Sequence, residues 1–437
     1  MSLKKESGIV SVIPLLVFVI IFLGGGIYFD DFYSLPTPLV ALIGVIVALL
    51  IYKAPFAEKM DVFFKGAGNN NVLTMCVIIL FAGAFATVAK ASGSVESIVN
   101  LGISYISPQY FPLGIFVIAS FLSFSTGTSV GTITTLAPVV ISLAEQSDLN
   151  ASLVGACLLS GSMFGDNLSL ISDTTIVATQ TMGCKMDEKM KANARIAFPA
   201  AVLTVIILLF LGNSQAKEIA IETQQDVNYV LILPYLAVVV LSLLGINVFV
   251  SLLLGVFFSG TLGMIYGKFD FLEFVNHTYR GFTDMSEIFL LFFFTGGLAA
   301  LVEHFGGIQF MMKFIQKRIK SPKTALLGMG TLVGTTDFCV ANNTVSILIV
   351  SKISRKIANQ FHLSGRDVAS VLDIFSCYVQ GIIPYGAQII ALIELSKGTI
   401  SYPEVAGYAI YLHLLLLSAL VYIFIRKYKK SDFQMSL

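Results

Sequence analysis

The sequence contains no tryptophan and only four histidines, and charged residues make up 12% of its 437 positions. An average soluble domain carries roughly 25% charged residues, so this composition excludes an ordinary soluble protein. The segments between its apolar runs are short, which leaves no room for a separate soluble domain. Any substrate must therefore bind within the apolar part of the chain.

Cysteines are also few, and their arrangement excludes two further classes of protein. The five cysteines show no CxxC spacing, so we expect free thiols rather than a disulfide framework or a zinc site. The net charge is +1, and the basic residues lie in short loops. The sequence therefore shows no continuous basic face of the kind that binds nucleic acid.

Apolar residues are abundant: 56% of the chain is hydrophobic, and the mean hydropathy is +0.86. These values are typical of an all-α polytopic membrane protein. Ten runs are long enough to span a hydrocarbon core of about 30 Å: residues 8–29, 37–52, 71–89, 151–181, 194–212, 229–244, 247–266, 286–302, 368–395 and 403–425. The first run is too long for a signal-peptide core, so we expect it to remain as a helix.

Two other runs, residues 111–146 and 323–351, are too long for one crossing and too short for two. Small and polar residues interrupt each run near its middle, at 125–132 and at 334–344. Half of the first run, ~16 residues, reaches only about 24 Å as a helix. We therefore predict two re-entrant hairpins whose polar tips stop inside the membrane.

The distribution of basic residues supports this topology through the positive-inside rule. With ten crossings, two hairpins and both termini in the cytoplasm, most lysines and arginines, Lys189 among them, fall on the cytoplasmic side. The basic residues left outside are Lys90, Lys217, Lys268, Arg280 and Lys397. We expect a multi-pass protein of the cell membrane.

The two halves of the chain resemble each other. Residues 81–93 align without gaps on 295–307, and the hairpin tips and the two long polar runs align at a similar offset. We predict a first repeat at 1–212, a linker at 213–228 and a second repeat at 229–437. Each repeat has five crossings, one hairpin and one helix broken near the midplane, at 151–181 or 368–395. Five crossings are an odd number, so the two repeats have inverted topology, as is common in secondary transporters.

Asp166 is the first candidate for chemistry, because a charge inside a membrane is costly and such acids usually face a cavity. Gly165 and the polar residues after it make an intact helix doubtful, whereas an unbroken helix would place Asp173 on the same face. Hydroxyl, amide and carboxylate oxygens suit alkali cations, and one acid that binds either Na⁺ or H⁺ suffices for antiport. The predicted site residues are Thr126, Thr128 and Ser129 at the first tip; Asp337, Asn342, Asn343 and Thr344 at the second tip; Asp166, Asn167, Asp173 and Thr174 at the first break; and Gln380, Tyr385 and Gln388 at the second break.

These residues also have simpler interpretations. Serine, threonine and glycine in membrane helices often serve only close packing, and Asp166 can be a structural acid bonded to backbone. Asn342 and Asn343 can cap the second half of their hairpin, and residues 384–386 can form a kink. Asp373 is a weaker candidate than the other acids, because it lies farther from the polar break.

Two stretches, Gly127-Thr-Ser-Val-Gly-Thr132 and Gly165-Asp-Asn-Leu-Ser-Leu-Ile-Ser-Asp-Thr-Thr175, resemble the NhaC family of sodium/proton antiporters. Ala341-Asn-Asn-Thr344 and Val379-Gln-Gly-Ile-Ile-Pro-Tyr-Gly-Ala-Gln388 resemble a shorter branch, linked to amino-acid uptake as well as antiport. The layout also resembles a superfamily of sodium-coupled carboxylate carriers, in which Ser-Asn-Thr motifs at hairpin tips bind sodium and substrate. This resemblance implies that Asn343 joins Asp166 as a sodium ligand, and that the chain forms a homodimer.

We therefore expect exchange of Na⁺ for H⁺ by alternating access, with the bilayer and these ions as partners and no cofactor beyond the ion itself. The alternative is a Na⁺- or H⁺-coupled transporter of a small organic solute such as an amino acid or a carboxylate. Tyr385 and Gln388 favour that alternative, while the lack of arginine in the site disfavours it. An intramembrane hydrolase with Asp166 and Asp337 as an aspartyl pair needs no inverted repeat, so we do not expect an enzyme.

Overall fold

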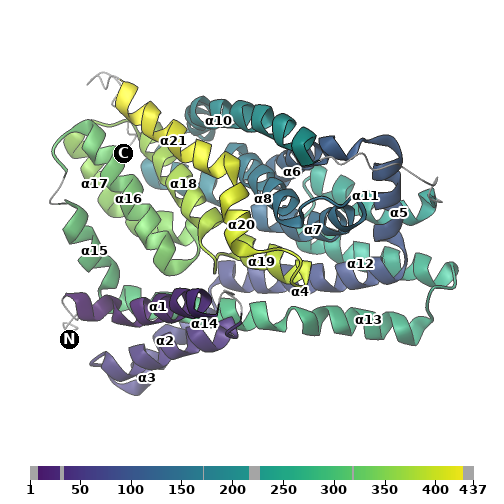
Figure 1. Ribbon diagram of the computed structural model, residues 1–437. Helices are drawn as coiled ribbons and strands as arrows, with labels where there is room; N and C mark the ends of the chain where they lie inside the picture. Colours follow the sequence, from purple (N-terminus) through teal and green to yellow (C-terminus); the bar gives the residue numbers. More distant parts are fainter. Residues whose placement is uncertain (1–7, 30–33, 171, 216–226, 317–318, 427–437) are drawn as a thin grey trace.

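The computed structural model describes residues 8–29, 34–170, 172–215, 227–316 and 319–426 (Figure 1). Every regular element in these ranges is a helix. Eight helical stretches are long and apolar enough to cross a membrane, or nine if a pair bent by 47° counts as one span. Two shorter apolar helices, Thr37–Ile51 and Tyr229–Leu243, add to these. The chain is a polytopic all-helical membrane protein, and the ten crossings stay a prediction.

The second half of the chain repeats the element order of the first. The first half contains α1 Ile13–Tyr28, α2 Thr37–Ile51, α3 Phe56–Ala67, α4 Asn70–Ala91, α5 Ser94–Tyr105, α6 Phe111–Thr126, α7 Ser129–Gln146, α8 Ala151–Leu168, α9 Asp173–Met182 and α10 Met186–Gln215. The second half contains α11 Tyr229–Leu243, α12 Val248–Ile265, α13 Phe271–Asp284, α14 Ser286–His304, α15 Gly307–Gln316, α16 Pro322–Val340, α17 Asn343–Phe361, α18 Gly365–Ile382, α19 Ala387–Ser396, α20 Tyr402–Tyr408 and α21 Ile410–Ile425. The bent pair α20 and α21 takes the place of α10.

Both predicted hairpins appear as pairs of helices joined by very short turns. Gly127 and Thr128 separate α6 from α7, and Ala341 and Asn342 separate α16 from α17. The second hairpin is longer than the predicted 323–351, because α17 continues through a polar end to Phe361. The entry of the hairpin tips into a membrane stays a prediction.

The two predicted broken helices are interrupted, and the first break lies within the polar stretch 165–174 where it was expected. Helix α8 continues through Gly165 to Leu168, and α9 begins at Asp173. Gly165 serves close packing instead: a methyl group there would lie 2.2 Å from the carbonyl oxygen of Ser120 on α6. The break also separates Asp166 from Asp173, so these acids do not share one helical face. The second break separates α18 from α19.

Helices α3 and α13 were not predicted, and each packs on a helix of the other half. Helix α3 lies against α14, and α13 lies against α4. The helix backbones come very close at both contacts. A methyl group added to Gly83 would lie 2.5 Å from the carbonyl oxygen of Gly281, and one added to Gly66 would lie 2.5 Å from the carbonyl oxygen of Gly296. This exchange ties the two halves to each other.

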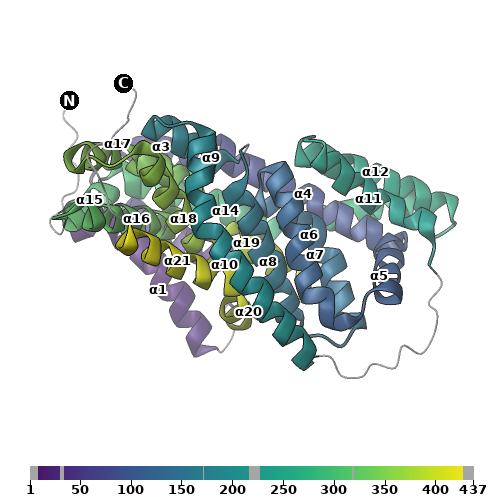
Figure 2. The same ribbon diagram turned by 90° about the horizontal axis from the view of Figure 1, so that it is seen from above.

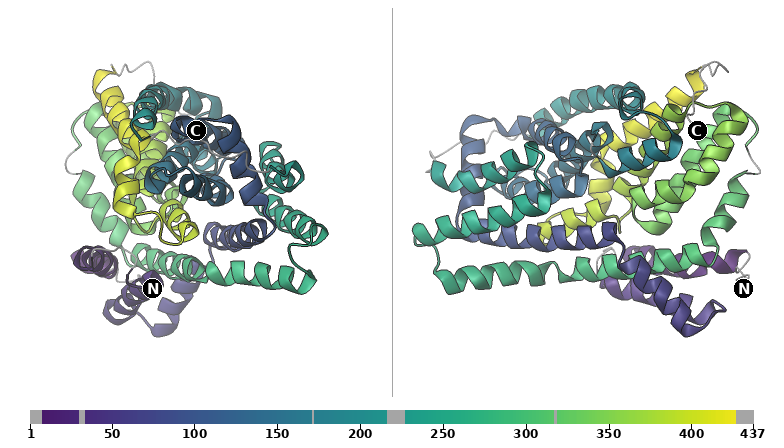
Figure 3. Two further views of the ribbon diagram at one scale, coloured as in Figure 1. Left: turned by 45° about the vertical axis from the view of Figure 1, so that its right-hand side comes forward. Right: turned by 180° about the vertical axis from the view of Figure 1, so that it is seen from behind.

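We call the two hairpins and two broken helices, residues 111–182 and 322–396, the hairpin bundle. Figures 1 and 3 show α4, α13 and α14 running along one side of the molecule, with the hairpin bundle beside them. Seen from above, α11 and α12 lie at one end and α15–α17 at the other (Figure 2). Most of the predicted linker, residues 216–226, lies outside the described residues.

Candidate ion-binding site

Asp166 lies in the last turn of α8, and the residue is only 8% exposed. Its Oδ2 accepts a hydrogen bond of 2.9 Å from the hydroxyl of Ser129, the first residue of α7. Its Oδ1 is buried and has no hydrogen-bond partner among the described residues. One carboxylate oxygen is therefore fixed by the first hairpin, and the other is available to a proton or a cation.

A chain of hydrogen bonds continues from Ser129 into the second half of the protein. Gln388, at the start of α19, donates from Nε2 to the hydroxyl of Ser129 at 3.0 Å. Gln380 of α18 donates to Oε1 of Gln388 at 3.0 Å and to the carbonyl oxygen of Ala341 at 3.2 Å. The contacts thus bring together both hairpin tips and both breaks, the four polar clusters singled out in the sequence.

A second buried acid lies one turn before the tip of the other hairpin. Asp337 is fully buried in α16, and its Oδ1 accepts from the hydroxyl of Ser346 at 3.3 Å. Its Oδ2 has no hydrogen-bond partner among the described residues. Tyr385 donates to the carbonyl oxygen of Phe338 at 2.6 Å, which fastens the second break to this hairpin. Ser346 was missed in the sequence, where it is one of many hydroxyls in an apolar run.

Several predicted residues hold the tips in shape. Asn342 is the N-cap of α17 and accepts from the backbone N–H of Val345 at 3.0 Å. Thr128 caps α7 in the same way, accepting from Gly131 at 3.2 Å. Asn343 accepts from the N–H of Thr344 at 2.9 Å. Asn342 therefore caps the second half of its hairpin, as the simpler interpretation proposed. This capping role is compatible with ion binding by the same side chain.

The remaining predicted residues are spread around this centre. Thr126 donates to the carbonyl oxygen of its own helix at Leu122. Asp173 is exposed at the start of α9, while Thr174 beside it is buried. Asn167 is buried and directs Nδ2 toward the hydroxyl of Tyr411 at 3.5 Å. Asp173 is the predicted acid that lies in the most exposed position, away from the hydrogen-bond chain.

A buried ion pair next to the first break was not predicted. The ammonium of Lys189 lies 2.6 Å from Oδ2 of Asp373, and both side chains are 1% exposed. Lys189 also donates to Thr175 at 2.6 Å, and Asn193 donates to Asp373 at 2.7 Å and to the carbonyl oxygen of Asn167 at 2.8 Å. The sequence counted Lys189 only as a basic residue of the cytoplasmic side and did not predict that its side chain is buried in an ion pair. Its spacing to Asn193, four residues on, was the available signal, because it places both on one face of α10.

The oxygens left open in this region suit a hard cation. Carboxylate, amide and carbonyl oxygens are the donors that such ions prefer, and unpartnered oxygens remain on Asp166, Asp337 and Gln380 within the described residues. In the described ranges no three His, Cys, Asp or Glu side chains come together as ligands of a metal ion. The arrangement fits an ion held by mixed oxygen donors around one acid.

The chain belongs to the Na⁺/H⁺ antiporter family, whose model matches residues 6–213 and again residues 214–425. The resemblance to NhaC antiporters is thereby confirmed. Family members are transporters, so this chain is a secondary transporter of the membrane and not an enzyme.

The relatives that this chain resembles are named as antiporters of different substrates. A malate-2H⁺/Na⁺-lactate antiporter of Bacillus subtilis is 21% identical, with 87% of this chain and 88% of the relative covered. The NhaC Na⁺/H⁺ antiporter of Alkalihalophilus pseudofirmus is also 21% identical, with 71% and 73% covered. The arginine/ornithine antiporter ArcD of Halobacterium salinarum is 22% identical, with 79% and 78% covered. Among solved structures, the YdaH transporter of Alcanivorax borkumensis is 13% identical, with a TM-score of 0.45 and 94% and 97% of the chains covered.

Proposed function

We propose that this protein exchanges Na⁺ for H⁺ across the cell membrane, and that the carboxylate of Asp166 is the group that binds the two ions alternately. The observation that carries the proposal is the buried Oδ1 of Asp166, which has no hydrogen-bond partner in the described part of the chain. A buried carboxylate that keeps one oxygen without a hydrogen-bond partner is costly when charged. Binding a proton or a sodium ion removes that cost, and one site cannot hold both.

Asn343 and Asp337 are proposed as the second part of the ion site. Both lie at the second hairpin. Hydrogen bonds from Ala341 through Gln380 and Gln388 to Ser129 link this hairpin to the first. We place the polar tips inside the membrane and both termini in the cytoplasm. The two successive matches of the family model support two repeats, and inverted repeats with a midplane site are a common architecture for alternating access. A homodimer remains part of the proposal.

A coupled organic solute is the second candidate. The name of the Bacillus subtilis relative, which includes malate and lactate, favours it, as does that of the arginine/ornithine antiporter. A site for an organic solute would need free hydrogen-bonding groups. The side chains of Gln380, Gln388 and Tyr385 already make hydrogen bonds to other protein groups, which weighs against this candidate. We therefore keep Na⁺/H⁺ exchange as the first proposal.

Transport in liposomes tests the choice. The purified protein is reconstituted with a pH-sensitive dye inside, and a Na⁺ gradient is imposed on wild type and on Asp166→Asn. We expect Na⁺ to drive proton movement in the wild type and the substitution to abolish it. Asp61→Asn is the matched control, because that carboxylate lies on α3 with its side chain 60% exposed and pairs only with Lys65 one turn away.

Two outcomes would change the proposal. Proton movement that begins only after an organic solute is added would replace exchange with solute coupling. Proton movement that survives in Asp166→Asn at the wild-type rate would move the site to another acid, with Asp337 next.

A further inference from the structure

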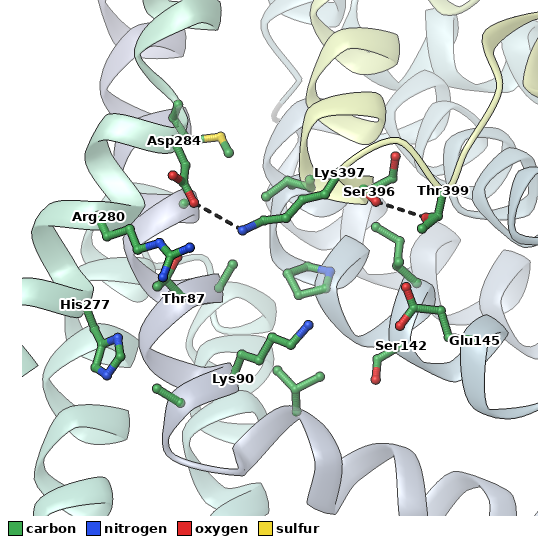
Figure 4. A pocket seen from close by; sticks show the side chains of 18 residues that line it. Thr87, Lys90, Ser142, Glu145, His277, Arg280, Asp284, Ser396, Lys397 and Thr399 are labelled. Carbon is green, nitrogen blue, oxygen red and sulfur yellow. Dashed lines mark hydrogen bonds and ion pairs between the residues drawn. The ribbon is translucent and has the colours of Figure 1, made fainter. Parts of the chain in front are cut away.

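A cavity of about 430 Å³ lies between α4, α7, α13 and the end of α19 (Figure 4). Its volume falls in the range of small-molecule sites, about 300–1,000 Å³. Basic side chains from three different elements line it: Lys90 from α4, Arg280 from α13 and Lys397 from the turn after α19. The acidic residues on its walls are Glu145 and Asp284. We call this space the basic cavity.

The cations of the basic cavity are only partly neutralised. Lys397 pairs with Asp284 at 3.2 Å, and this pair is drawn at the top of the view in Figure 4. Within the described ranges the ammonium of Lys90 and the guanidinium of Arg280 have no hydrogen-bond or ion-pair partner. In the same view Arg280 and Glu145 stand on opposite walls, so Glu145 does not pair with Arg280. An excess of positive charge therefore faces the open space.

The location of these cations argues against a general solvated surface. Lys90, Arg280 and Lys397 are among the few basic residues that the predicted topology leaves outside the cytoplasm. Membrane proteins tend to place lysine and arginine in cytoplasmic loops. Three that depart from this tendency line one cavity.

Two helices, α7 and α19, connect the basic cavity to the candidate ion site. Helix α7 begins at Ser129, which contacts Asp166, and reaches the cavity at Pro138. Nine residues of helix rise about 14 Å. Helix α19 begins beside Gln388 and reaches the cavity at Ser396. A solute in the cavity would therefore stand at the outer ends of the two helices whose inner ends hold the ion site.

We propose that the basic cavity binds a small organic anion through its carboxylate, with Lys90 and Arg280 as the residues that contact it. The inference rests on the second candidate function, coupling to an organic solute, and gives that solute a chemical class and a binding site. Guanidinium and ammonium groups bind carboxylates by charge-assisted hydrogen bonds.

Binding to the purified full chain tests this directly. Calorimetry measures the Kd of succinate and lactate, with the uncharged succinamide and lactamide as comparison ligands. Lys90→Gln and Arg280→Gln should each raise the Kd of the acids roughly three- to tenfold at low salt, because each loses one charged contact that is partly screened. Lys90→Arg should keep near wild-type affinity. Lys268→Gln is the control, since it removes an exposed, predicted-outside charge that does not line the cavity.

Glu145→Gln sharpens the test. Removing an acid from the wall should tighten succinate binding severalfold, because a like charge is lost. Weaker succinate binding in Glu145→Gln would mean that the acid does not repel the ligand, and it would overturn the anion assignment. Three other results would overturn the anion assignment as well. The first is equal affinity for an acid and its amide, and the second is no binding of either acid. The third is a Kd that is unchanged in both Lys90→Gln and Arg280→Gln.

The proposed exchange activity is measured separately in liposomes. Sodium-driven proton movement in a protein that binds no carboxylate would overturn this inference alone. Carboxylate binding that weakens in the two variants, in a protein that moves no protons with Na⁺, would support the basic cavity and overturn only the exchange of Na⁺ for H⁺.

Discussion

Ala341 turns the second hairpin with φ at 51°, where the first hairpin has Gly127 at φ 68°. An L-residue in this left-handed region costs roughly 1–2 kcal/mol, and glycine avoids the cost. We predict opposite effects of two substitutions on stability. Gly127→Ala should lower the free energy of unfolding by about 1 kcal/mol or more, whereas Ala341→Gly should leave it unchanged or raise it by up to ~1 kcal/mol. Thermal unfolding in detergent measures both, and shifts of the same sign would contradict the strain at Ala341.

The Lys189–Asp373 pair gives a second prediction at this scale. Removing one partner of a fully buried pair leaves an uncompensated charge and costs about 3–5 kcal/mol. Lys189→Gln and Asp373→Asn should each destabilise by that order, and Lys189→Met combined with Asp373→Leu should recover most of the loss. Thermal unfolding of the single and double variants measures the coupling.

The exposed pair Lys191–Asp187 provides the control, at 3.2 Å on the same helix. The matched changes Lys191→Gln and Asp187→Asn should leave the melting temperature nearly unchanged, because both side chains are exposed to solvent. Equal costs at the two pairs would mean that Lys189 is not buried as described.

Among the elements, glycine contacts decide how closely helices approach. A methyl group on Gly281 would lie 2.5 Å from the carbonyl oxygen of Gly83, and neither backbone can give way without moving a helix. We predict that Gly83→Ala or Gly281→Ala lowers the melting temperature clearly, because α13 is displaced from α4. At Gly114 and Gly407 nothing lies within 4 Å of an added methyl group. There alanine should raise the stability by about 0.5–1 kcal/mol through its helix propensity, and destabilisation at these two positions would contradict the packing account.

Element prediction from sequence succeeded where polarity interrupts an apolar run. Gly127 and the hydroxyl residues around it mark a turn, and the structure turns there. Helix α13 was missed although Asp270 and Glu273 form a capping box, which is visible in the sequence. This helix is amphipathic, so the segment is not a continuous apolar run, and a search for apolar runs assigned it to a loop.

The candidate site shows where sequence reasoning ends. Asp166, Ser129 and Gln388 were singled out separately. The contact of Ser129 with Asp166 spans 37 positions of sequence, and its contact with Gln388 spans 259. The Lys189–Asp373 pair was missed: the spacing of Lys189 and Asn193 marks a polar face on α10, but it does not identify Asp373 as the partner on another helix. Gly165 was interpreted as a helix breaker, whereas its lack of a side chain serves the approach of α8 to α6.

At the scale of the whole molecule, the Lys397–Asp284 pair joins the hairpin bundle to α13. If alternating access moves the bundle past α4 and α13, this contact must open in every cycle. We predict that a short thiol cross-linker between Asp284→Cys and Lys397→Cys stops sodium-driven proton movement in liposomes, and that cleaving the linker restores it.

The control pair lies between α3 and α14, where His304 stands 3.3 Å from Glu58. Both helices lie outside the hairpin bundle, so cross-linking Glu58→Cys to His304→Cys should leave transport intact. Full activity with the α13 cross-link in place would contradict movement between the bundle and this helix.

The central claim is that Na⁺ and H⁺ share the carboxylate of Asp166. The direct measurement is proton release from purified protein in weakly buffered solution when Na⁺ is added, with K⁺ at equal ionic strength as reference. The account predicts that Na⁺ displaces protons from the wild type, that Asp166→Asn releases none, and that Asp61→Asn behaves as wild type. Sodium binding without proton release in the wild type, or unchanged release in Asp166→Asn, would contradict the claim.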